Sequence, residues 1–340
     1  MIIRSKAPLR LGLAGGGTDV SPYSDLYGGA ILNATINMYA YASIEPTDDG
    51  MIIFEYPDKN FREEFKSVTE LPVDGDFSLQ KGAYNRIVKD FTGKALSFKL
   101  TTFVDAPAGS GLGTSSTLVV SILGAFTEWL KLPLGEYDIA RLAYDIERKD
   151  LNMAGGKQDQ YAATFGGFNF MEFVNDNVIV NPLHVKNRYK DELSHNLVLY
   201  YTETSRLSSK IIESQVKNVS AKNEESIFAM HELKNQALKM KESLLRGNID
   251  DIGTILDISW EHKKKMAREI TNENLEHIYN IAKQAGATGG KVSGAGGGGF
   301  MFFYCPSVSR YKVIDALKSC GAGYAQRYEF TDEGLKTWTV

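Results

Sequence analysis

Residues 107–116 read Pro-Ala-Gly-Ser-Gly-Leu-Gly-Thr-Ser-Ser, and this stretch governs how the rest of the chain is interpreted. Three glycines lie in a predicted turn, and an apolar segment suited to a helix, 117–130, follows at once. The first N–H groups of a helix lack partners and carry partial positive charge, so they attract anions. Glycines let the chain wrap closely around a phosphate. The stretch therefore predicts either a phosphate-binding loop or an ordinary turn capped by Ser or Thr.

Two further Gly-rich stretches, 12–19 and 289–299, favour the first interpretation. Three such elements in one chain indicate a large anionic ligand held by backbone groups. The stretch 294–299 matches G-x-G-x-x-G, but it leads into a predicted strand, which is the wrong context for dinucleotide binding. A Walker motif is excluded because Lys291 is followed by Val292, and the protein-kinase triplets H-R-D and D-F-G do not occur.

Composition indicates an ordinary globular protein. The chain has 340 residues, 43% hydrophobic and 24% charged, with a net charge of −4. The acidic balance argues against nucleic-acid binding, and neither a membrane span nor a signal peptide is recognisable. Cys305 and Cys320 have no metal-like or redox-like spacing and are predicted to be core residues in a reducing compartment. We expect a cytoplasmic protein with no membrane or nucleic-acid partner, and we place Lys263-Lys264-Lys265 on the solvated side of a helix.

The order of the predicted elements indicates an α+β protein. Apolar and alternating segments predict strands in the first half at 4–14, 30–45, 51–55, 97–105, 168–173 and 177–180. Helices are predicted there at 117–130 and 134–151. A charged segment, 187–192, divides the predicted domains 1–187 and 188–340. The second half predicts a strand at 196–201, helices at 208–219, 224–246, 249–268 and 274–285, and a closing strand, helix and strand at 300–305, 308–319 and 323–330.

The three Gly-rich stretches occur with other characteristic residues, in a fixed order. Ala7-Pro8-Leu9-Arg10 leads to Gly15 and Thr18-Asp19, then come 107–116 and Lys291-Val292-Ser293 with the glycines that follow. This combination resembles the three signatures of the GHMP small-molecule kinases, among them galactokinases, homoserine kinases and mevalonate kinases, across essentially the whole chain. The resemblance implies a two-domain α+β fold, with an N-terminal domain like domain 2 of ribosomal protein S5 and a ferredoxin-like C-terminal α/β sandwich. It also implies ATP-dependent phosphoryl transfer to a hydroxyl group.

The resemblance assigns roles to individual residues. Asp159 would act as a base or orient the attacking hydroxyl, and Arg10 would pair with it and offset charge on the transferred group. Ser115 and Glu147 would be ligands of Mg²⁺, which prefers hard oxygen atoms; the alternative for Glu147 is a surface carboxylate. The phosphates of ATP would contact Pro107, Gly109, Ser110, Gly111, Leu112, Gly113, Thr114, Ser115 and Ser116.

The first signature, Arg10 with Thr18-Asp19, indicates which class of molecule accepts the phosphoryl group. Arg10 and Thr18-Asp19 resemble the sugar kinases more than the mevalonate kinases, and Asp19 is expected either to accept hydrogen bonds from sugar hydroxyls or to cap the helix that follows it. Residues 8–44 are similar to the D-glycero-D-manno-heptose 7-phosphate kinases and, less closely, to fucokinases. The resemblance implies phosphorylation of the anomeric hydroxyl of a heptose 7-phosphate, giving a 1,7-bisphosphate for surface polysaccharides.

The sugar phosphate needs its own contacts. Lys157, Lys291 and Arg206 with Ser208 and Ser209 are candidates for its phosphate, or else ordinary salt-bridge partners. The full predicted acceptor site is Gly16, Gly17, Thr18, Asp19, Lys157, Arg206, Lys291, Gly294, Gly296 and Gly297.

Several alternatives stay open at this point. They are another sugar, such as fucose or galactose, a decarboxylase of diphosphorylated mevalonate, and a non-catalytic sensor on the same fold. A sensor predicts damage at Arg10, Ser115, Glu147 or Asp159, and all four are present. The oligomeric state, monomer or homodimer, also stays open.

Overall fold

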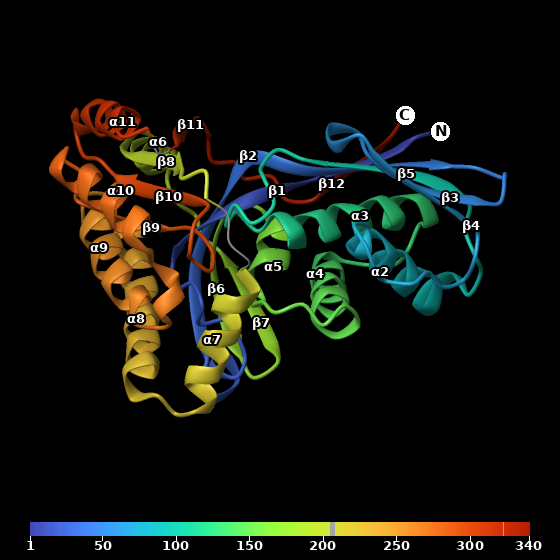
Figure 1. The fold of residues 1–340 in the computed structure, drawn as a ribbon, viewed down its shortest axis with the longest axis horizontal. Helices are drawn as coiled ribbons and strands as arrows, with labels where there is room; N and C mark the ends of the chain where they lie inside the picture. Colours follow the sequence, from blue (N-terminus) through green and yellow to red (C-terminus); the bar gives the residue numbers. More distant parts are fainter. Residues whose placement is uncertain (205–207, 322) are drawn as a thin grey trace.

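The computed structural model describes residues 1–204, 208–321 and 323–340, and it contains two β-sheets with helices packed against them (Figure 1). In the larger, eight-stranded sheet the order is β12-β1-β2-β5-β3-β4, with β6 beside β2 and β7 beside β6. All neighbours are antiparallel except β3 and β5. The strands are β1 (Ile3–Ala14), β2 (Gly29–Pro46), β3 (Met51–Tyr56), β4 (Phe61–Lys66), β5 (Phe98–Val104), β6 (Phe168–Val174), β7 (Asn177–Pro182) and β12 (Lys336–Thr339).

The helices α2 (Ser78–Ile87), α3 (Thr114–Leu130), α4 (Glu136–Asp145) and α5 (Gln158–Phe165) lie on one side of this sheet (Figure 1). The central one is α3, and every residue of 116–126 within it is buried. A helix that is apolar on all sides must be enclosed, and α3 lies between the sheet and its neighbours. This packing fixes the position of the α3 N-terminus.

The second sheet has the strand order β11-β8-β10-β9 and is antiparallel throughout. Its strands are β8 (Leu197–Tyr201), β9 (Gly289–Val292), β10 (Phe300–Tyr304) and β11 (Tyr324–Gln326). Its β-α-β-β-α-β succession is the ferredoxin-like arrangement, so the predicted fold class is confirmed. The helices of this half are α6 (Asn187–Asn196), α7 (Ser208–Ser220), α8 (Glu224–Arg246), α9 (Asp251–Lys264), α10 (Glu273–Gln284) and α11 (Ser309–Ser319).

The chain differs from the sequence prediction in a few places. The segment 187–192 is the start of α6 rather than a linker, and the strand predicted at 323–330 shrinks to β11. The helix predicted at 134–151 is α4 continued by one π-helical turn, Ile146–Asp150. The elements α2, α5, β4, β9 and β12 were not predicted, and Asp159, which was predicted to lie in a loop, lies in the first turn of α5. Short strands such as β12 carry little apolar alternation, so their pairing partner decides their conformation.

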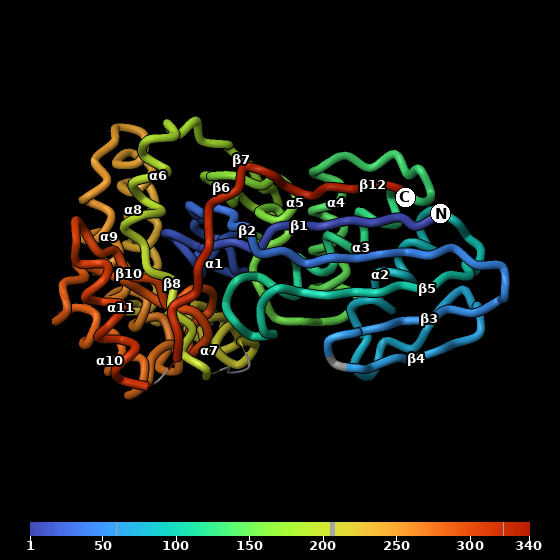
Figure 2. Tube along the Cα trace, turned by 90° about the horizontal axis from the view of Figure 1, so that it is seen from above, coloured from blue at the N-terminus to red at the C-terminus, as the bar shows by residue number. Residues whose placement is uncertain are grey.

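The last strand returns to the first. β12 pairs with β1, with Ile3 opposite Thr339, and the two chain ends lie side by side in both views (Figures 1 and 2). The division into 1–187 and 188–340 stays a prediction, and the tail that carries β12 belongs to the large sheet by its pairing.

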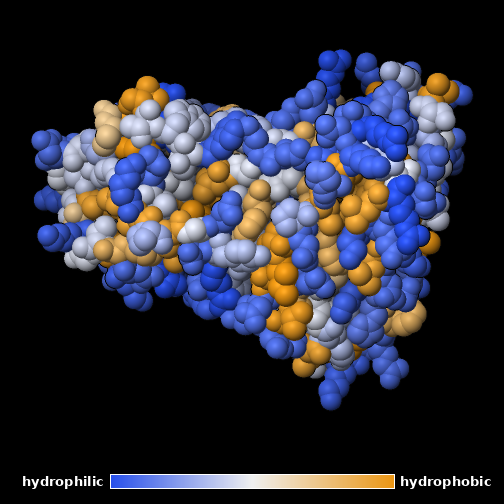
Figure 3. All heavy atoms as spheres, turned by 180° about the vertical axis from the view of Figure 1, so that it is seen from behind, coloured by the Kyte–Doolittle hydropathy of each residue, from blue (hydrophilic) through white to orange (hydrophobic). Residues whose placement is uncertain are grey.

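The face seen in Figure 3 and the two cysteines are typical of a globular protein. Figure 3 shows mainly hydrophilic residues on the face opposite to that of Figure 1, with apolar patches between them. None of the helices in the described ranges is long and apolar enough to span a membrane. Cys305 is buried and Cys320 half-buried, and both are free thiols.

Candidate active site

The Gly-rich loop before α3 forms part of the wall of a cavity of about 480 Å³. Gly109, Gly111 and Gly113 have φ values of 74°, 81° and 79°, a left-handed conformation that residues with a side chain rarely adopt. These glycines line the cavity together with Thr114, Ser115 and Ser116, so the α3 N-terminus opens onto it. Of the other predicted phosphate contacts, Leu112 and Ser110 are buried behind the loop, and Pro107 also does not line the cavity.

The third Gly-rich stretch packs backbone to backbone against this loop. A Cβ atom on Gly111 would lie 2.4 Å from the carbonyl oxygen of Ser293, and one on Gly294 would lie 2.8 Å from the Gly111 Cα. The Phe300 N–H donates to the Ser110 carbonyl at 2.8 Å. Gly111 and Gly294 are therefore required because the two Gly-rich segments approach so closely that a side chain at either position would clash with the backbone of the other segment. Gly294 lines the cavity, whereas Gly296 and Gly297 do not.

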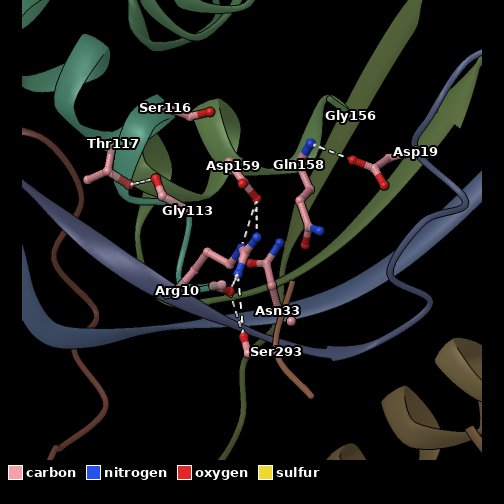
Figure 4. A network of polar contacts seen from close by, with 12 residues as sticks. Arg10, Asp19, Asn33, Gly113, Ser116, Thr117, Gly156, Gln158, Asp159 and Ser293 are labelled. Carbon is pink, nitrogen blue, oxygen red and sulfur yellow. Dashed lines mark hydrogen bonds and ion pairs between the residues drawn. The ribbon is translucent and has the colours of Figure 1, made fainter. Parts of the chain in front are cut away.

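Arg10 and Asp159 face one another at the centre of the site (Figure 4). Arg10 lies on β1, is 3% exposed, and places Nε 2.8 Å and Nη2 2.7 Å from the same oxygen, Oδ1 of Asp159. Its Nη1 donates to the Gly111 carbonyl. Asp159 lies in the first turn of α5, and a Cβ on Gly113 would lie 3.1 Å from its Cγ. Sequence analysis predicted this pair, and the structure places it beside the phosphate loop.

Ser115 and Glu147 also meet. Ser115 Oγ donates to Glu147 Oε1 at 2.7 Å, and Gln160 Nε2 donates to the other Glu147 oxygen and to Ser116 Oγ. Glu147 is only 1% exposed, so it is no surface carboxylate. No group of three His, Cys, Asp or Glu side chains suited to a metal occurs among the described residues. A hydroxyl and a carboxylate at a phosphate loop fit Mg²⁺, whose other ligands would be water and phosphate oxygens.

Asp19 links the first signature to α5. Its Oδ2 accepts hydrogen bonds from the N–H groups of Lys157 at 2.8 Å and Gln158 at 3.0 Å, 138 and 139 residues away, at the α5 N-terminus (Figure 4). A Cβ on Gly156 would lie 1.9 Å from that oxygen. Burial raises the pKa of Asp19, with a further contribution from the Asp159 carboxylate and opposition from the backbone N–H groups. Asp19 therefore caps a distant helix, not the one that follows it, and still lines the cavity.

Several predicted acceptor residues lie outside the cavity wall. Lys157 Nζ points to Asp25 at 3.4 Å and to the Asn175 carbonyl at 3.2 Å. Lys291 Nζ donates to the carbonyls of Gly12 at 2.7 Å and Leu13 at 3.3 Å, beneath β1. The structure brings Gly17, Asp19 and Gly294 to the cavity, and it does not bring Gly16, Thr18, Lys157, Lys291, Gly296 and Gly297. Arg206 lies outside the described residues.

Three charged residues of the wall, Arg148, Glu213 and Lys263, were not predicted as site residues, and Lys263 is the most deeply buried of them. Lys263, predicted to be solvated, is 2% exposed and lines the cavity, so that prediction is wrong. The signal was present in α9, because Ile252, Leu256, Ser259 and Lys263 are spaced by four, three and four residues and share its buried face. Burial lowers the pKa of Lys263 to about 8.

Other residues of the cavity wall were also not predicted from sequence. They include Met153, Gln158 and Gln215. Ser208 and Ser209, which were predicted to accompany Arg206, do line the cavity.

These features together define a small-molecule kinase: a glycine loop at a helix N-terminus, a hydroxyl–carboxylate pair beside it, and an Arg–Asp pair facing both. Residues 78–167 match the model of the GHMP kinases N terminal domain, and residues 240–323 match that of the GHMP kinases C terminal domain. The chain belongs to the GHMP kinase family. The family resemblance and the enzyme class predicted from sequence are therefore confirmed, including dependence on ATP.

Relatives and solved structures give closer comparisons. The chain is 52% identical, over 99% of both chains, to D-glycero-alpha-D-manno-heptose 7-phosphate kinase of Campylobacter jejuni. It is 27% identical, over 88% of its own length and 34% of the relative's, to L-fucokinase/L-fucose-1-P guanylyltransferase of Bacteroides fragilis. A crystal structure described as a D-glycero-D-manno-heptose 1-phosphate kinase from Bacteroides thetaiotaomicron shares 49% identity over 99% of both chains, with a TM-score of 0.85.

Proposed function

We propose that this protein transfers the γ-phosphoryl group of ATP to the anomeric hydroxyl of D-glycero-D-manno-heptose 7-phosphate, giving the 1,7-bisphosphate used for surface polysaccharides. The observation that carries the proposal is one cavity in which the Arg10–Asp159 pair faces the glycine loop at the α3 N-terminus. The 52% identity to a heptose 7-phosphate kinase supports the choice of acceptor over fucose or galactose.

The nucleotide phosphates would lie on the N–H groups of the loop and of the first turn of α3, where the helix dipole favours negative charge. Ser115 and Glu147 would hold Mg²⁺, which when bound neutralises charge on the phosphates. Gln160 keeps the Glu147 carboxylate in place from the opposite side. The loop and this pair thus account for phosphate binding through positioned polar groups.

Asp159 would accept the proton of the attacking hydroxyl. Both contacts from Arg10 to Asp159 go to Oδ1, which leaves Oδ2 for the acceptor, and Oδ2 faces Gly113 of the glycine loop. The sugar oxygen forms a bond to the γ-phosphorus while the bond to the bridging oxygen of ADP breaks. Arg10 would offset charge on the transferred group, and Asp19 holds the α5 N-terminus so that Asp159 stays aimed at the acceptor.

An acceptor panel tests this function. ADP release is measured with heptose 7-phosphate, heptose 1-phosphate, free heptose, fucose, galactose and mevalonate, and phosphorus NMR locates the new phosphate. We expect kcat/KM for heptose 7-phosphate to exceed the others by about 100-fold or more, since a pocket built for a polar group rejects analogues that lack it. Turnover of fucose, galactose or heptose 1-phosphate in preference to the 7-phosphate would refute the proposed acceptor.

A further inference from the structure

Lys263 is the buried charge in the cavity wall that the proposed mechanism does not use. Its side chain is 2% exposed, lines the cavity, and makes no hydrogen bond or ion pair within the described ranges of the chain. Burying an ammonium group without a partner is costly, and proteins avoid it unless a ligand supplies the counter-charge.

The other largely buried charges of the described wall have partners within the chain. Arg148 lies 3.8 Å from Glu147 Oε1 and donates to the carbonyls of Met153 and Gly156. Arg10 is paired with Asp159. Asp19 accepts two N–H groups at a helix N-terminus. Glu147 accepts from Ser115 and Gln160. Among the described residues Lys263 has no hydrogen bond or ion pair. The Asp19 carboxylate favours its charged form but is already bonded to two N–H groups, so the remaining counter-charge is left for a ligand to supply.

The surroundings of Lys263 belong to the acceptor side of the cavity. A Cβ on Gly16 would lie 3.9 Å from its Nζ, and one on Gly17 would lie 3.6 Å from Gln215 Oε1. These residues come from the first signature and α7, not from the phosphate loop. Gln215 is buried, lines the cavity, and has no hydrogen bond from its amide within the described ranges. This part of the site therefore contains the Lys263 ammonium group and the Gln215 side-chain amide next to the backbone of Gly16 and Gly17, which have no side chains.

We infer that Lys263, assisted by Gln215, binds the phosphate group that the acceptor sugar carries before the reaction. A phosphomonoester supplies the missing negative charge and three acceptor oxygens, and an ammonium group binds it as a point charge. This inference rests on the proposed function, because it names the residues that distinguish a sugar phosphate from a free sugar. The γ-phosphoryl group of ATP is the other phosphate that could bind to Lys263, and the experiment below distinguishes the two.

The test is Lys263→Met, measured with heptose 7-phosphate and with free heptose, with KM for ATP determined in parallel. We expect kcat/KM to fall about 10- to 100-fold further with the phosphorylated acceptor than with free heptose, the size of a charge-assisted hydrogen bond. KM for ATP should be unaffected. Equal losses with both acceptors, or a rise in KM for ATP instead, would overturn the inference.

Two variants serve as controls. Lys265→Met makes the same replacement two residues further on, at an exposed position outside the cavity, and should behave as wild type. Lys263→Arg keeps the positive charge and should recover much of the selectivity lost in Lys263→Met. A folded Lys263→Arg protein with no more selectivity than Lys263→Met would contradict a charge-based role.

A binding readout separates this inference from the proposed function. If wild type turns over no heptose phosphate, the proposed function fails, and the inference is judged by melting temperature in the presence of saturating ADP. Inorganic phosphate should then raise the melting temperature of wild type and Lys265→Met but not of Lys263→Met. An equal rise in all three proteins would overturn it.

A pH profile provides an independent signature. Lys263 interacts with Asp19, which favours its protonated form, and with Arg10 and Lys291, which oppose it, and burial lowers its pKa to about 8. Raising the pH removes the charge, so kcat/KM for the sugar phosphate should decline above about pH 8 in wild type. In Lys263→Arg the decline should be absent, because a guanidinium group stays protonated.

Discussion

At the scale of single residues, the site depends on a few buried charges that each have more than one contact. Arg10 joins three segments, because it bonds Asp159 on α5, the Gly111 carbonyl in the phosphate loop and Ser293 in the third signature. Asp19 holds the helix on which Asp159 lies. The position of the Asp159 carboxylate is thus set by two charged side chains, one from β1 and one from the turn that follows it.

Replacing Asp159 by Asn tests the role of that carboxylate. Asn keeps an oxygen for Arg10 but cannot take a proton, so kcat should fall by about 10²- to 10⁴-fold, the range for loss of general-base catalysis. Binding of ATP, measured by calorimetry, should be retained. Asp48→Asn, at an exposed position, is the matched control. Full activity of Asp159→Asn would show that the proposed chemistry is wrong.

At the scale of elements, the cavity exists because two Gly-rich segments touch without side chains between them. The phosphate loop ends on α3, which is enclosed on all sides, and the third signature runs from β9 to β10 of the second sheet. The hydrogen bond from Phe300 N–H to the Ser110 carbonyl ties the two segments together. The contact therefore couples the two sheets directly at the wall of the cavity.

A methyl group at Gly111 should disrupt this contact. Gly111→Ala places Cβ 2.4 Å from the Ser293 carbonyl oxygen, whereas Gly50→Ala, at a φ of 73°, has nothing within 4 Å. Both variants should lose about 1–2 kcal/mol of unfolding free energy for the left-handed conformation. Only Gly111→Ala should lose kcat/KM as well, by about 10-fold or more, because the loops must separate. Unfolding in urea and initial rates measure the two effects, and equal kcat/KM values would rule out the loop contact as a requirement.

At the scale of the whole molecule, the last strand of the chain pairs with the first. The C-terminal segment leaves the second sheet, crosses to the first, and ends as β12 beside β1. On the way, the Leu335 N–H donates to the Thr164 carbonyl of α5, and the Leu335 side chain packs on α3 at Gly124. The tail thus stabilises the same two helices that present the phosphate loop and Asp159.

Leu335→Ala measures this contribution. Removing a partly buried leucine side chain that packs against the core should lower the unfolding free energy by about 1–2 kcal/mol. Leu26→Ala, at a position 65% exposed, should change it by less than about 0.5 kcal/mol. Denaturant unfolding compares the two variants, and a Leu335→Ala protein as stable as Leu26→Ala would mean that the tail contributes little.

Much of this molecule follows from local sequence. The strands at 30–45 and 97–105, the helix at 224–246 and the glycine loop were all predicted, because apolar periodicity and left-handed turn positions are properties of neighbouring residues. The three signatures in order also determined the family, since Arg10, Ser115, Glu147 and Asp159 are each identified by adjacent residues.

The acceptor side was decided only by tertiary structure. In sequence, Lys157 and Lys291 were either contacts of the acceptor phosphate or ordinary salt-bridge partners, and in the structure they are held by Asp25 and by the β1 carbonyls. Lys263 was predicted to be solvated and is buried in the cavity wall. Asp19 caps a helix 138 residues away. The packing of α5, α7, α9 and β1 against one another determines which charged side chains find a partner. That packing joins residues far apart in the chain, so neighbouring residues do not specify it. The sequence by itself therefore determined the glycine loop and the class of chemistry, and the folded chain decided which cation of the cavity wall lacks an ion pair among the described residues.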